Sequence, residues 1–239
     1  MTDTVQLTRE DGVAVITLAR PEKANAYTQA MLARLRAHLD DLAVDASVTV
    51  VVVTGGRKHF SAGADLDELS VRCGRDALDL ASRQTFDQLA RMPQPVIAAI
   101  GGAAIAGGFE MALACDLRVC SPDARFALTE TALGLVPAAG GMRRLVHILG
   151  AARTKELVLC GREIDAPTAH AWGIVNSIEG DVLARAMAVA RSLQSRDAVA
   201  QRLAKMAIDA TAAGGVDGAL EAAIQAFLYE RRHNAPSRS

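Results

Sequence analysis

The sequence is poor in aromatic residues, which make up 3% of its 239 positions. Aromatic rings are the platforms on which proteins stack unpaired bases, so their scarcity disfavours binding of single-stranded nucleic acid. An excess of charge of one sign is also missing: 26 basic and 27 acidic side chains give a net charge of −1. No basic field is therefore available to attract nucleic acid or an anionic membrane, and we expect neither as a partner.

Cysteine is scarce, and no pair of cysteines has the C-x-x-C spacing or a nearby histidine at zinc-ligand spacing. The four cysteines are Cys73, Cys115, Cys120 and Cys160. We expect buried free thiols in a reducing compartment and no metal site. The first ten residues, MTDTVQLTRE, have no apolar run behind a basic patch, which argues against a signal peptide. The expected location is the cytoplasm.

One charge-free stretch, from Met92 to Phe109, is about as long as a membrane-spanning helix. Prolines and glycines interrupt it, which predicts a short strand, a turn and the start of a helix in place of a membrane span. This stretch is therefore expected to lie in the core of a folded domain.

The composition is that of a packed domain, with 51% apolar and 22% charged residues. Hydrophobic spacing predicts alternating strands and helices in the first part of the chain. Strands are expected at 5–7, 13–18, 48–54, 96–100 and 117–120, and helices at 28–44, 76–92 and 108–114. Later helices are expected at 151–159, 166–172, 181–193, 198–212 and 216–232, with one strand at 174–178. The pattern divides the chain into an α/β portion, 1–150, and a helical portion, 151–239.

Three segments in the α/β portion carry candidate site residues: 61–65 (SAGAD), 106–110 (AGGFE) and 126–130 (FALTE). The first two are small-residue turns after predicted strands, where open α/β sheets place their sites. Small side chains let a ligand reach backbone N–H groups, so such turns can hold an anion or a developing oxyanion. The alternative is that the glycines only permit tight turns. The sequence lacks both G-x-x-x-x-G-K-[ST] and G-x-G-x-x-G, which excludes phosphate binding by those motifs.

Two glutamates lie in apolar surroundings within these segments. Glu110 is on the first turn of a short apolar helix, and Glu130 lies among apolar residues. A carboxylate near a helix N-terminus gains only a few tenths of a kcal/mol, which burial would outweigh. Two carboxyl groups in apolar settings can be driven to different pKa values, so that one site holds both an acid and a base.

In these segments the chain resembles the crotonase superfamily, and most of all its enoyl-CoA hydratases. The resemblance covers nearly the whole chain and rests on several separate motifs in the right order. The matching segments are 20–26 (RPEKANA), 59–66 (HFSAGADL), 105–110 (IAGGFE) with 114–116 (ACD), and 130–145, which contains GLVP and GGMRRL.

The resemblance implies the fold and the assembly. The implied fold is α/β, a crotonase-like spiral of ββα units followed by a C-terminal helical region. Region 1–150 would hold the acyl-CoA site, and region 151–239 would serve oligomerisation and pocket closure. A homotrimer or a dimer of trimers is implied. Family members commonly continue into a further segment that packs on a neighbouring subunit and contacts the CoA adenine, whereas this sequence ends at Ser239.

The resemblance also implies the oxyanion hole and the acids. The substrate carbonyl would bind between the backbone N–H groups of Ala64 and Gly107, while Glu110 and Glu130 would hold and activate a water. The glycine triplet common before the first glutamate is here Ala106-Gly107-Gly108, which keeps the donor glycine.

The same resemblance assigns the substrate-binding positions. Lys23 would lie near the CoA phosphates, and Ala62, Asp65 and Leu66 would line the CoA channel. Arg143 and Arg144 are expected to be structural, and Arg231, Arg232 and Arg238 are candidates for the adenine contact.

The expected function is that of an enoyl-CoA hydratase without metal or redox cofactor, because coenzyme A is part of the substrate. Two alternatives stay open. An isomerase of the same fold would shift the double bond with one glutamate, and a non-catalytic acyl-CoA-binding protein would carry out no reaction. The sequence does not define the length or branching of the acyl chain.

Overall fold

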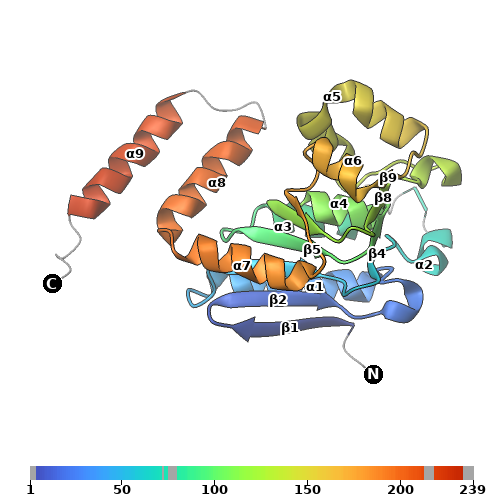
Figure 1. Cartoon of the computed structure of the whole chain (residues 1–239), viewed down its shortest axis with the longest axis horizontal. Coiled ribbons are helices and arrows are strands. Elements are labelled where there is room, and N and C mark those ends of the chain that lie inside the picture. The colour runs from blue at the N-terminus through green and yellow to red at the C-terminus, as the bar shows by residue number, and fades with distance from the viewer. Residues whose placement is uncertain (1–3, 72, 75–79, 213–217, 234–239) are drawn as a thin grey trace.

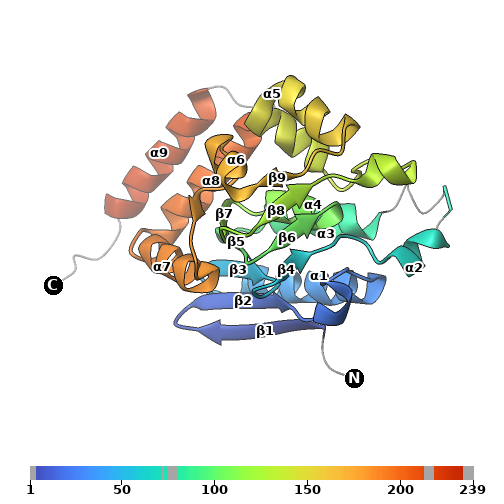
Figure 2. The ribbon, with the colours of Figure 1, turned by 45° about the vertical axis from the view of Figure 1, so that its right-hand side comes forward.

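The computed structural model describes residues 4–71, 73–74, 80–212 and 218–233. Its strands form two sheets, and in each sheet the two edge strands come from distant parts of the sequence (Figures 1 and 2). The strands are β1 (Val5–Glu10), β2 (Val13–Leu18), β3 (Val50–Thr54), β4 (His59–Ser61), β5 (Val96–Ile100), β6 (Ala103–Ile105), β7 (Leu117–Cys120), β8 (Arg125–Ala127), β9 (Ile164–Asp165) and β10 (Ser177–Ile178).

The larger sheet has the order β1-β2-β3-β5-β7-β10, and the smaller has the order β4-β6-β8-β9. In the larger sheet β1 and β2 form a hairpin around Asp11-Gly12, and every other neighbouring pair is parallel. In the smaller sheet β4, β6 and β8 are parallel, and β9 closes the edge antiparallel to β8. After the β1–β2 hairpin, each successive pair of strands thus contributes one strand to each sheet. This is the spiral that the resemblance implies.

Helices surround the two sheets. Two short 3-10 turns, η1 (Pro21–Lys23) and η2 (Glu130–Leu133), lie beside the candidate active site described below. The helices are α1 (Gln29–Val44), α2 (Leu66–Ser70), α3 (Ala81–Ala90), α4 (Gly107–Leu113), α5 (Gly141–Leu159), α6 (Ala166–Ala171), α7 (Val182–Gln194), α8 (Ala198–Ala212) and α9 (Gly218–His233). Thr28 caps α1 by accepting a hydrogen bond from the Met31 N–H over 3.2 Å, as its sequence position predicts.

The central strands β3 and β5 are fully buried, because helices cover both faces of the larger sheet. On one face Val51 and Val53 join a core built with α1, α3 and the smaller sheet. On the other face Val50 and Val52 pack against α7. Four of the five phenylalanines are in the core and fully buried: Phe60, Phe86, Phe109 and Phe126.

Several sequence predictions need correction. No strand is expected at 59–61, where the structure has β4, and the strand expected at 174–178 is reduced to β10. The helix expected at 151–159 is the second half of α5, which begins at Gly141. Residues 76–79 and 216–217 of two expected helices lie outside the described residues. All four cysteines are free, but Cys73 and Cys160 are exposed, so the expectation of burial is wrong for these two.

The division near residue 150 stays a prediction. Gly150 interrupts α5 with a φ of 73°, outside the helical range. However, β9 and β10, which come after it, pair with β8 and β7 of the first portion. Region 151–239 therefore completes both sheets as well as adding helices.

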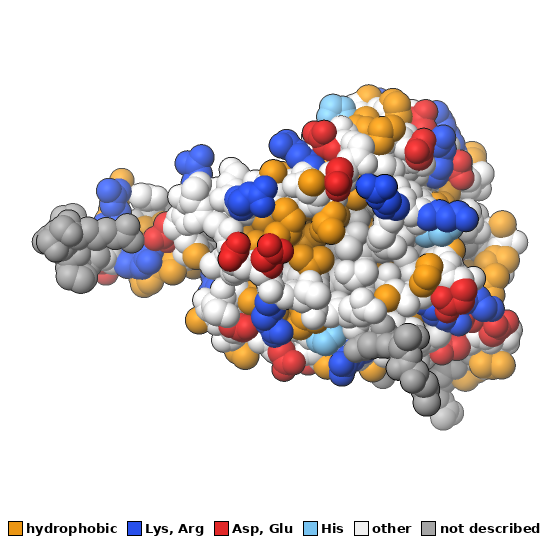
Figure 3. Space-filling view, turned by 60° about the horizontal axis from the view of Figure 1, so that its bottom comes forward, with side chains coloured by type: hydrophobic (Ala, Val, Ile, Leu, Met, Phe, Trp, Pro, Cys, Tyr) orange, Lys and Arg blue, Asp and Glu red, His pale blue; other side chains and the backbone are white. Residues whose placement is uncertain are grey.

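The later helices α8 and α9 form a hairpin at one side of the body (Figures 1 and 2). Lys205 of α8 joins this hairpin to the body by an ion pair of 2.7 Å with Asp116. On the face in Figure 3, lysine and arginine side chains are scattered among acidic ones. Among the described residues, no helix is both long and apolar enough to cross a membrane.

Candidate active site

A cavity of about 810 Å³ opens where the parallel strands of the smaller sheet end. β4 leads into residues 62–65, β6 leads into the start of α4, and β8 leads into η2. Because carboxyl ends of parallel strands meet at one edge, these three connections converge. The cavity is lined by all eight residues that the sequence singled out, namely Lys23, Ala62, Ala64, Asp65, Leu66, Gly107, Glu110 and Glu130.

The backbone at Ala64 is oriented by a parallel bridge to Tyr27. The Tyr27 N–H donates to the Gly63 carbonyl over 2.8 Å, and the Asp65 N–H donates to the Tyr27 carbonyl over 2.9 Å. In this pairing the N–H of Ala64 itself points away from Tyr27. Among the described residues this N–H has no hydrogen-bond partner, and Ala64 lines the cavity.

The second backbone donor comes from the start of α4. Gly107 is the first residue of this helix, so its N–H has no acceptor within the helix. The preceding Ala106 is held by its N–H donating to the Ala127 carbonyl of β8 over 2.8 Å. A Cβ on Gly107 would lie 2.0 Å from the Tyr27 hydroxyl oxygen, so only glycine fits there without displacing Tyr27. Two N–H groups, on two elements, thus line one cavity.

Glu110 is 3% exposed and its carboxylate is held from outside its own helix. Its Oε1 accepts the Ala139 N–H over 2.9 Å and the Gly141 N–H over 2.8 Å. Burial raises the pKa of Glu110 to about 7, the N–H bonds from Gly141 and Ala139 act in the opposite direction, and the charge of Glu130 adds to the rise. Near neutral pH this carboxyl therefore exists in both protonation states.

Glu130 is the first residue of η2 and is half-buried. Burial raises the pKa of this carboxyl above its ordinary value. Its Oε2 is buried and has no hydrogen-bond partner within the described part of the chain. An unpaired carboxyl oxygen in an enclosed site is costly, so its retention fits a functional group. The site thus pairs Glu110, whose Oε1 accepts two N–H groups, with Glu130, whose Oε2 accepts none within the described residues.

Two of the predicted substrate-binding residues have charged partners. The carboxylate of Asp65 is 2.5 Å from the Arg20 guanidinium. It also accepts a hydrogen bond from the N–H of Asp67, in the first turn of α2. The hydrogen bond from Arg20 holds the pKa of Asp65 below its ordinary value. Lys23 is half exposed, with its Nζ 3.3 Å from Asp67. The Asp65 side chain therefore fixes the loop, while Lys23 remains accessible to solvent.

Exposed apolar side chains surround the glutamates in the cavity. Leu66, Leu133 and Val136 are 63%, 58% and 59% exposed, although each lines the cavity. Monomeric proteins seldom expose such clusters without a binding function, so these side chains mark a surface for an apolar ligand. The described lining ends at Ala139, and closure by region 151–239 stays a prediction.

Sequence reasoning missed three residues of this site: Tyr27, Ala139 and Gly141. Each lies inside or beside a quoted motif, Tyr27 directly after 20–26 and the other two within 130–145. Ala139 and Gly141 act through backbone N–H groups, and no side-chain pattern reports which carbonyl or carboxylate a backbone group will meet.

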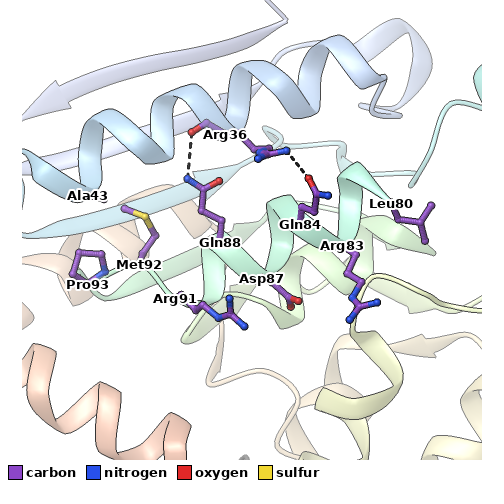
Figure 4. Close-up of a pocket in the computed structure, with 10 residues that line it drawn as sticks. All are labelled: Arg36, Ala43, Leu80, Arg83, Gln84, Asp87, Gln88, Arg91, Met92 and Pro93. Carbon is purple, nitrogen blue, oxygen red and sulfur yellow. Dashed lines mark hydrogen bonds between the residues drawn. The ribbon is translucent and has the colours of Figure 1, made fainter. Parts of the chain in front are cut away.

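A second cavity, of about 640 Å³, lies between α1 and α3 (Figure 4). Its polar side chains bond across the two helices: Arg36 donates to Gln84 over 2.7 Å, and Gln88 donates to Asp40 over 2.7 Å. Figure 4 shows Arg83 and Arg91 pointing to the other side of α3 from Arg36, so the three guanidinium groups do not converge. This groove is therefore a helix–helix contact with polar edges. The described residues hold no cluster of His, Cys, Asp and Glu able to bind a metal.

Comparisons with known proteins agree with this geometry. Residues 8–235 match the enoyl-CoA hydratase/isomerase family. The chain is 34% identical over 229 residues to the short-chain-enoyl-CoA hydratase of Clostridium acetobutylicum, covering 93% of this chain and 87% of that protein. The crystal structure of an enoyl-CoA hydratase from Bacillus anthracis superposes with a TM-score of 0.90 at 34% identity, covering 99% of this chain and 93% of that one. A Thermobifida fusca YX protein, solved in complex with CoA, gives a TM-score of 0.89 at 32% identity, with coverages of 97% and 95%.

The two-sheet spiral, with Glu110 and Glu130 in one cavity, has the architecture of a crotonase-type enzyme. The chain belongs to the enoyl-CoA hydratase/isomerase family. It is therefore an enzyme, and the hydratases among its relatives are hydro-lyases.

Proposed function

We propose that the chain is an enoyl-CoA hydratase, which reversibly adds water across the 2,3 double bond of a 2-enoyl-CoA thioester. The observation that carries the proposal is the placement of Glu110 and Glu130 in the cavity that Ala64 and Gly107 also line. The reaction needs one group to take a proton from water and another to give a proton to carbon. Glu110, whose pKa burial raises to about 7, and Glu130, whose pKa burial also raises, can fill these two roles.

The thioester oxygen would bind between the N–H groups of Ala64 and Gly107. As water attacks C3, the electrons of the double bond move toward this oxygen and form an enolate. Donors that are fixed before the reaction stabilise the new charge with little reorganisation, and losing one such donor typically costs about 10²–10³ in rate. The N–H groups of Ala64, beside its bridge to Tyr27, and of Gly107, at the start of α4, fit this role.

The two glutamates would divide the proton transfers. The N–H bonds to Glu110 favour its ionised form, so we assign it the proton that leaves water as the oxygen bonds to C3. Glu130 has a buried Oε2 without a hydrogen-bond partner among the described residues, so we assign it the proton given to C2. One water is added, the double bond is lost, and the pair as a whole keeps its charge. This chemistry needs no metal or redox group.

The remaining predicted residues would bind the rest of the substrate. Lys23 lies on the exposed edge of the cavity and carries a charge suited to a CoA phosphate. Ala62 and Leu66 offer short or apolar side chains to the pantetheine arm, and the Asp65–Arg20 pair fixes the loop that carries them. The exposed Leu133 and Val136 would contact the acyl chain.

The alternative within the same family is an isomerase, which needs one glutamate to carry a proton between two carbons. The presence of two carboxyl groups in the cavity favours hydration. The reverse reaction separates the two. A hydratase forms 2-enoyl absorbance from a 3-hydroxyacyl-CoA by removing water, whereas an isomerase or a non-catalytic acyl-CoA-binding protein leaves that substrate unchanged. Testing short, long and branched 3-hydroxyacyl-CoA substrates would also define the acyl preference.

We further propose that the chain assembles as a homotrimer or a dimer of trimers. Support comes from the α8–α9 hairpin, where Met206, Ile208 and Phe227 are 48%, 68% and 51% exposed. Light scattering at micromolar concentration should report a trimer or hexamer, and a monomer would contradict the proposal. The cytoplasmic location and the expectation of no nucleic-acid or membrane partner stay predictions of the sequence.

A further inference from the structure

The turn that holds Glu110 is itself held by one arginine. Arg144, on the first turn of α5, is 13% exposed at its side chain. Its Nη1 donates to the Ala139 carbonyl over 3.2 Å, and Ala139 is one of the two residues whose N–H groups bind Glu110. The Arg144 backbone N–H donates to the Gly140 carbonyl over 3.2 Å. Arg144 therefore contacts the same short turn through its side chain and its backbone.

The other end of the guanidinium reaches α3. Its Nη2 is 3.0 Å from Asp87 Oδ1 and 3.4 Å from the Phe86 carbonyl oxygen. The Phe86 ring packs edge-on against Tyr27, with 5.7 Å between ring centroids. Tyr27 in turn limits the space at Gly107. Two successive residues of α3 are thus linked to both halves of the site: Asp87 to the turn that binds Glu110 through Arg144, and Phe86 to Gly107 through Tyr27.

We propose that Arg144 is a positioning residue for Glu110: by joining the Ala139–Gly141 turn to α3, it keeps the two N–H donors aimed at the Glu110 carboxylate. This inference rests on the proposed hydratase function, in which Glu110 takes a proton from water. Arg144 itself does not line the cavity, so it acts through the turn and not on the substrate.

Arg143 supplies a matched control for this proposal. It pairs with the same carboxylate, Asp87, but its side chain is 57% exposed. No hydrogen bond joins its side chain to the 139–141 turn among the described residues. An exposed pair of this kind contributes little to stability, typically about 0–1 kcal/mol. Arg143 and Arg144 therefore share a partner and a charge, and differ in their contact with the turn.

The charge of Arg144 also acts on Glu110. The charged groups around Glu110 are Glu130 of η2, which raises its pKa, and Arg144 of α5, which lowers it. Arg144 in turn faces Arg143 and Asp87. Removing Arg144 takes away one influence that favours the ionised carboxylate, and loosening the turn weakens the two N–H bonds that do the same. Both changes move the pKa of Glu110 upward.

The test compares Arg144→Ala, Arg144→Lys and Arg143→Ala in hydration of a 2-enoyl-CoA, with rates expressed per folded site from CoA binding. Arg144→Ala should lower kcat by about 10-fold to 10²-fold with KM nearly unchanged, the scale expected when a catalytic group is misplaced. The acidic limb of its kcat–pH profile should move to higher pH. Arg144→Lys keeps the charge with a single contact point, so it should restore the pH profile and only part of kcat. Arg143→Ala should match the parent.

The proposal is overturned if both Arg144 variants behave as Arg143→Ala does, or if they raise KM and leave kcat unchanged. If Arg144→Ala does not fold, the loss of kcat in Arg144→Lys decides the question. A second readout does not depend on the reaction: titration of the Glu110 carboxyl by carbon NMR, assigned with Glu110→Gln. Its pKa should rise in Arg144→Ala and stay at the parent value in Arg143→Ala. A parent that shows no hydration but passes this titration would refute the proposed function and leave the positioning role standing.

Discussion

The N–H of Gly141 donates a hydrogen bond of 2.8 Å to the Glu110 carboxylate across a separation of 31 residues. Gly141 begins α5 and Glu110 lies in the first turn of α4, so two helix N-termini meet at one carboxylate. Helix N-termini carry a partial positive charge, which favours the ionised form of an acid there. The protonation state of the Glu110 carboxyl therefore depends on α5 as well as on its own helix.

Gly141→Ala should displace the Glu110 carboxylate without unfolding the protein. A Cβ at residue 141 would lie 2.6 Å from Cγ and 2.9 Å from Oε1 of Glu110, so the glutamate side chain must move. Because the added Cβ would meet the Glu110 side chain and not backbone, we expect a folded variant whose kcat falls by about 10²-fold. Steady-state hydration kinetics measure this loss.

Gly180→Ala is the control, since nothing lies within 4 Å of a Cβ there. It should keep the parent kcat. Full activity in Gly141→Ala would show that Glu110 need not sit where the turn holds it.

Replacing either glutamate by glutamine should lower kcat strongly and leave thioester binding nearly intact. Glutamine keeps the size of the side chain but cannot exchange a proton, so Glu110→Gln and Glu130→Gln should each lose about 10²-fold or more in kcat. Calorimetric titration with a saturated acyl-CoA checks the affinity. Near-parent hydration by either variant would refute the two-acid mechanism.

Glu110→Gln should also change how stability depends on pH. Between the ordinary pKa of 4.5 and the folded-state pKa of about 7, the folded parent keeps a proton that the unfolded chain has lost. The parent therefore loses stability as pH rises through this window, by about 2–3 kcal/mol between pH 5 and pH 8 from this group alone. In the variant, the amide oxygen of the introduced glutamine can still accept both N–H bonds, and the amide does not titrate.

Urea unfolding at both pH values measures the effect. Relative to the parent, the variant should gain about 2–3 kcal/mol between pH 5 and pH 8. Parallel pH profiles for the two proteins would mean that Glu110 titrates near its ordinary value.

Ala106→Gly should stabilise the protein. Ala106 has φ 51° and ψ −127°, a conformation of the first central residue in a type II′ turn, which glycine favours. Strain of this kind costs on the order of 1–3 kcal/mol, and glycine relieves it. Glycine also gives the unfolded chain more conformational entropy, which offsets part of this relief, so we expect a net gain in stability of about 1 kcal/mol. Ala104→Gly, in the buried strand β6, should instead lower stability by about 1 kcal/mol. A loss in Ala106→Gly would show that the turn carries no strain.

The sequence predicted the larger sheet much better than the smaller one. Continuous apolar runs such as 96–100 fix a buried strand by composition alone, and that strand ends where expected. In contrast, β4, β6 and β8 have three residues each, too few for alternation to appear. Their pairing comes from the spiral, which brings segments about 20 to 40 positions apart into register.

For the site, motif matching found the side chains and the sheet topology explains why they meet. Glu110 and Glu130 stand out in the sequence for their apolar neighbours, and the structure places both in one cavity. Neither the role of Ala139 and Gly141 as donors nor the contact of Arg144 with their turn could be predicted. Both depend on how the start of α5 packs on α3 and α4, which no local pattern encodes.

The most direct test of the account is the mass of the product formed from a 2-enoyl-CoA in water enriched in heavy oxygen. The account predicts a 3-hydroxyacyl-CoA that has gained one water and carries the heavy oxygen. It further predicts that Glu110→Gln and Glu130→Gln form this product at least about 10²-fold more slowly. A product of unchanged mass, whether an isomer with a shifted double bond or the unreacted thioester, would contradict it.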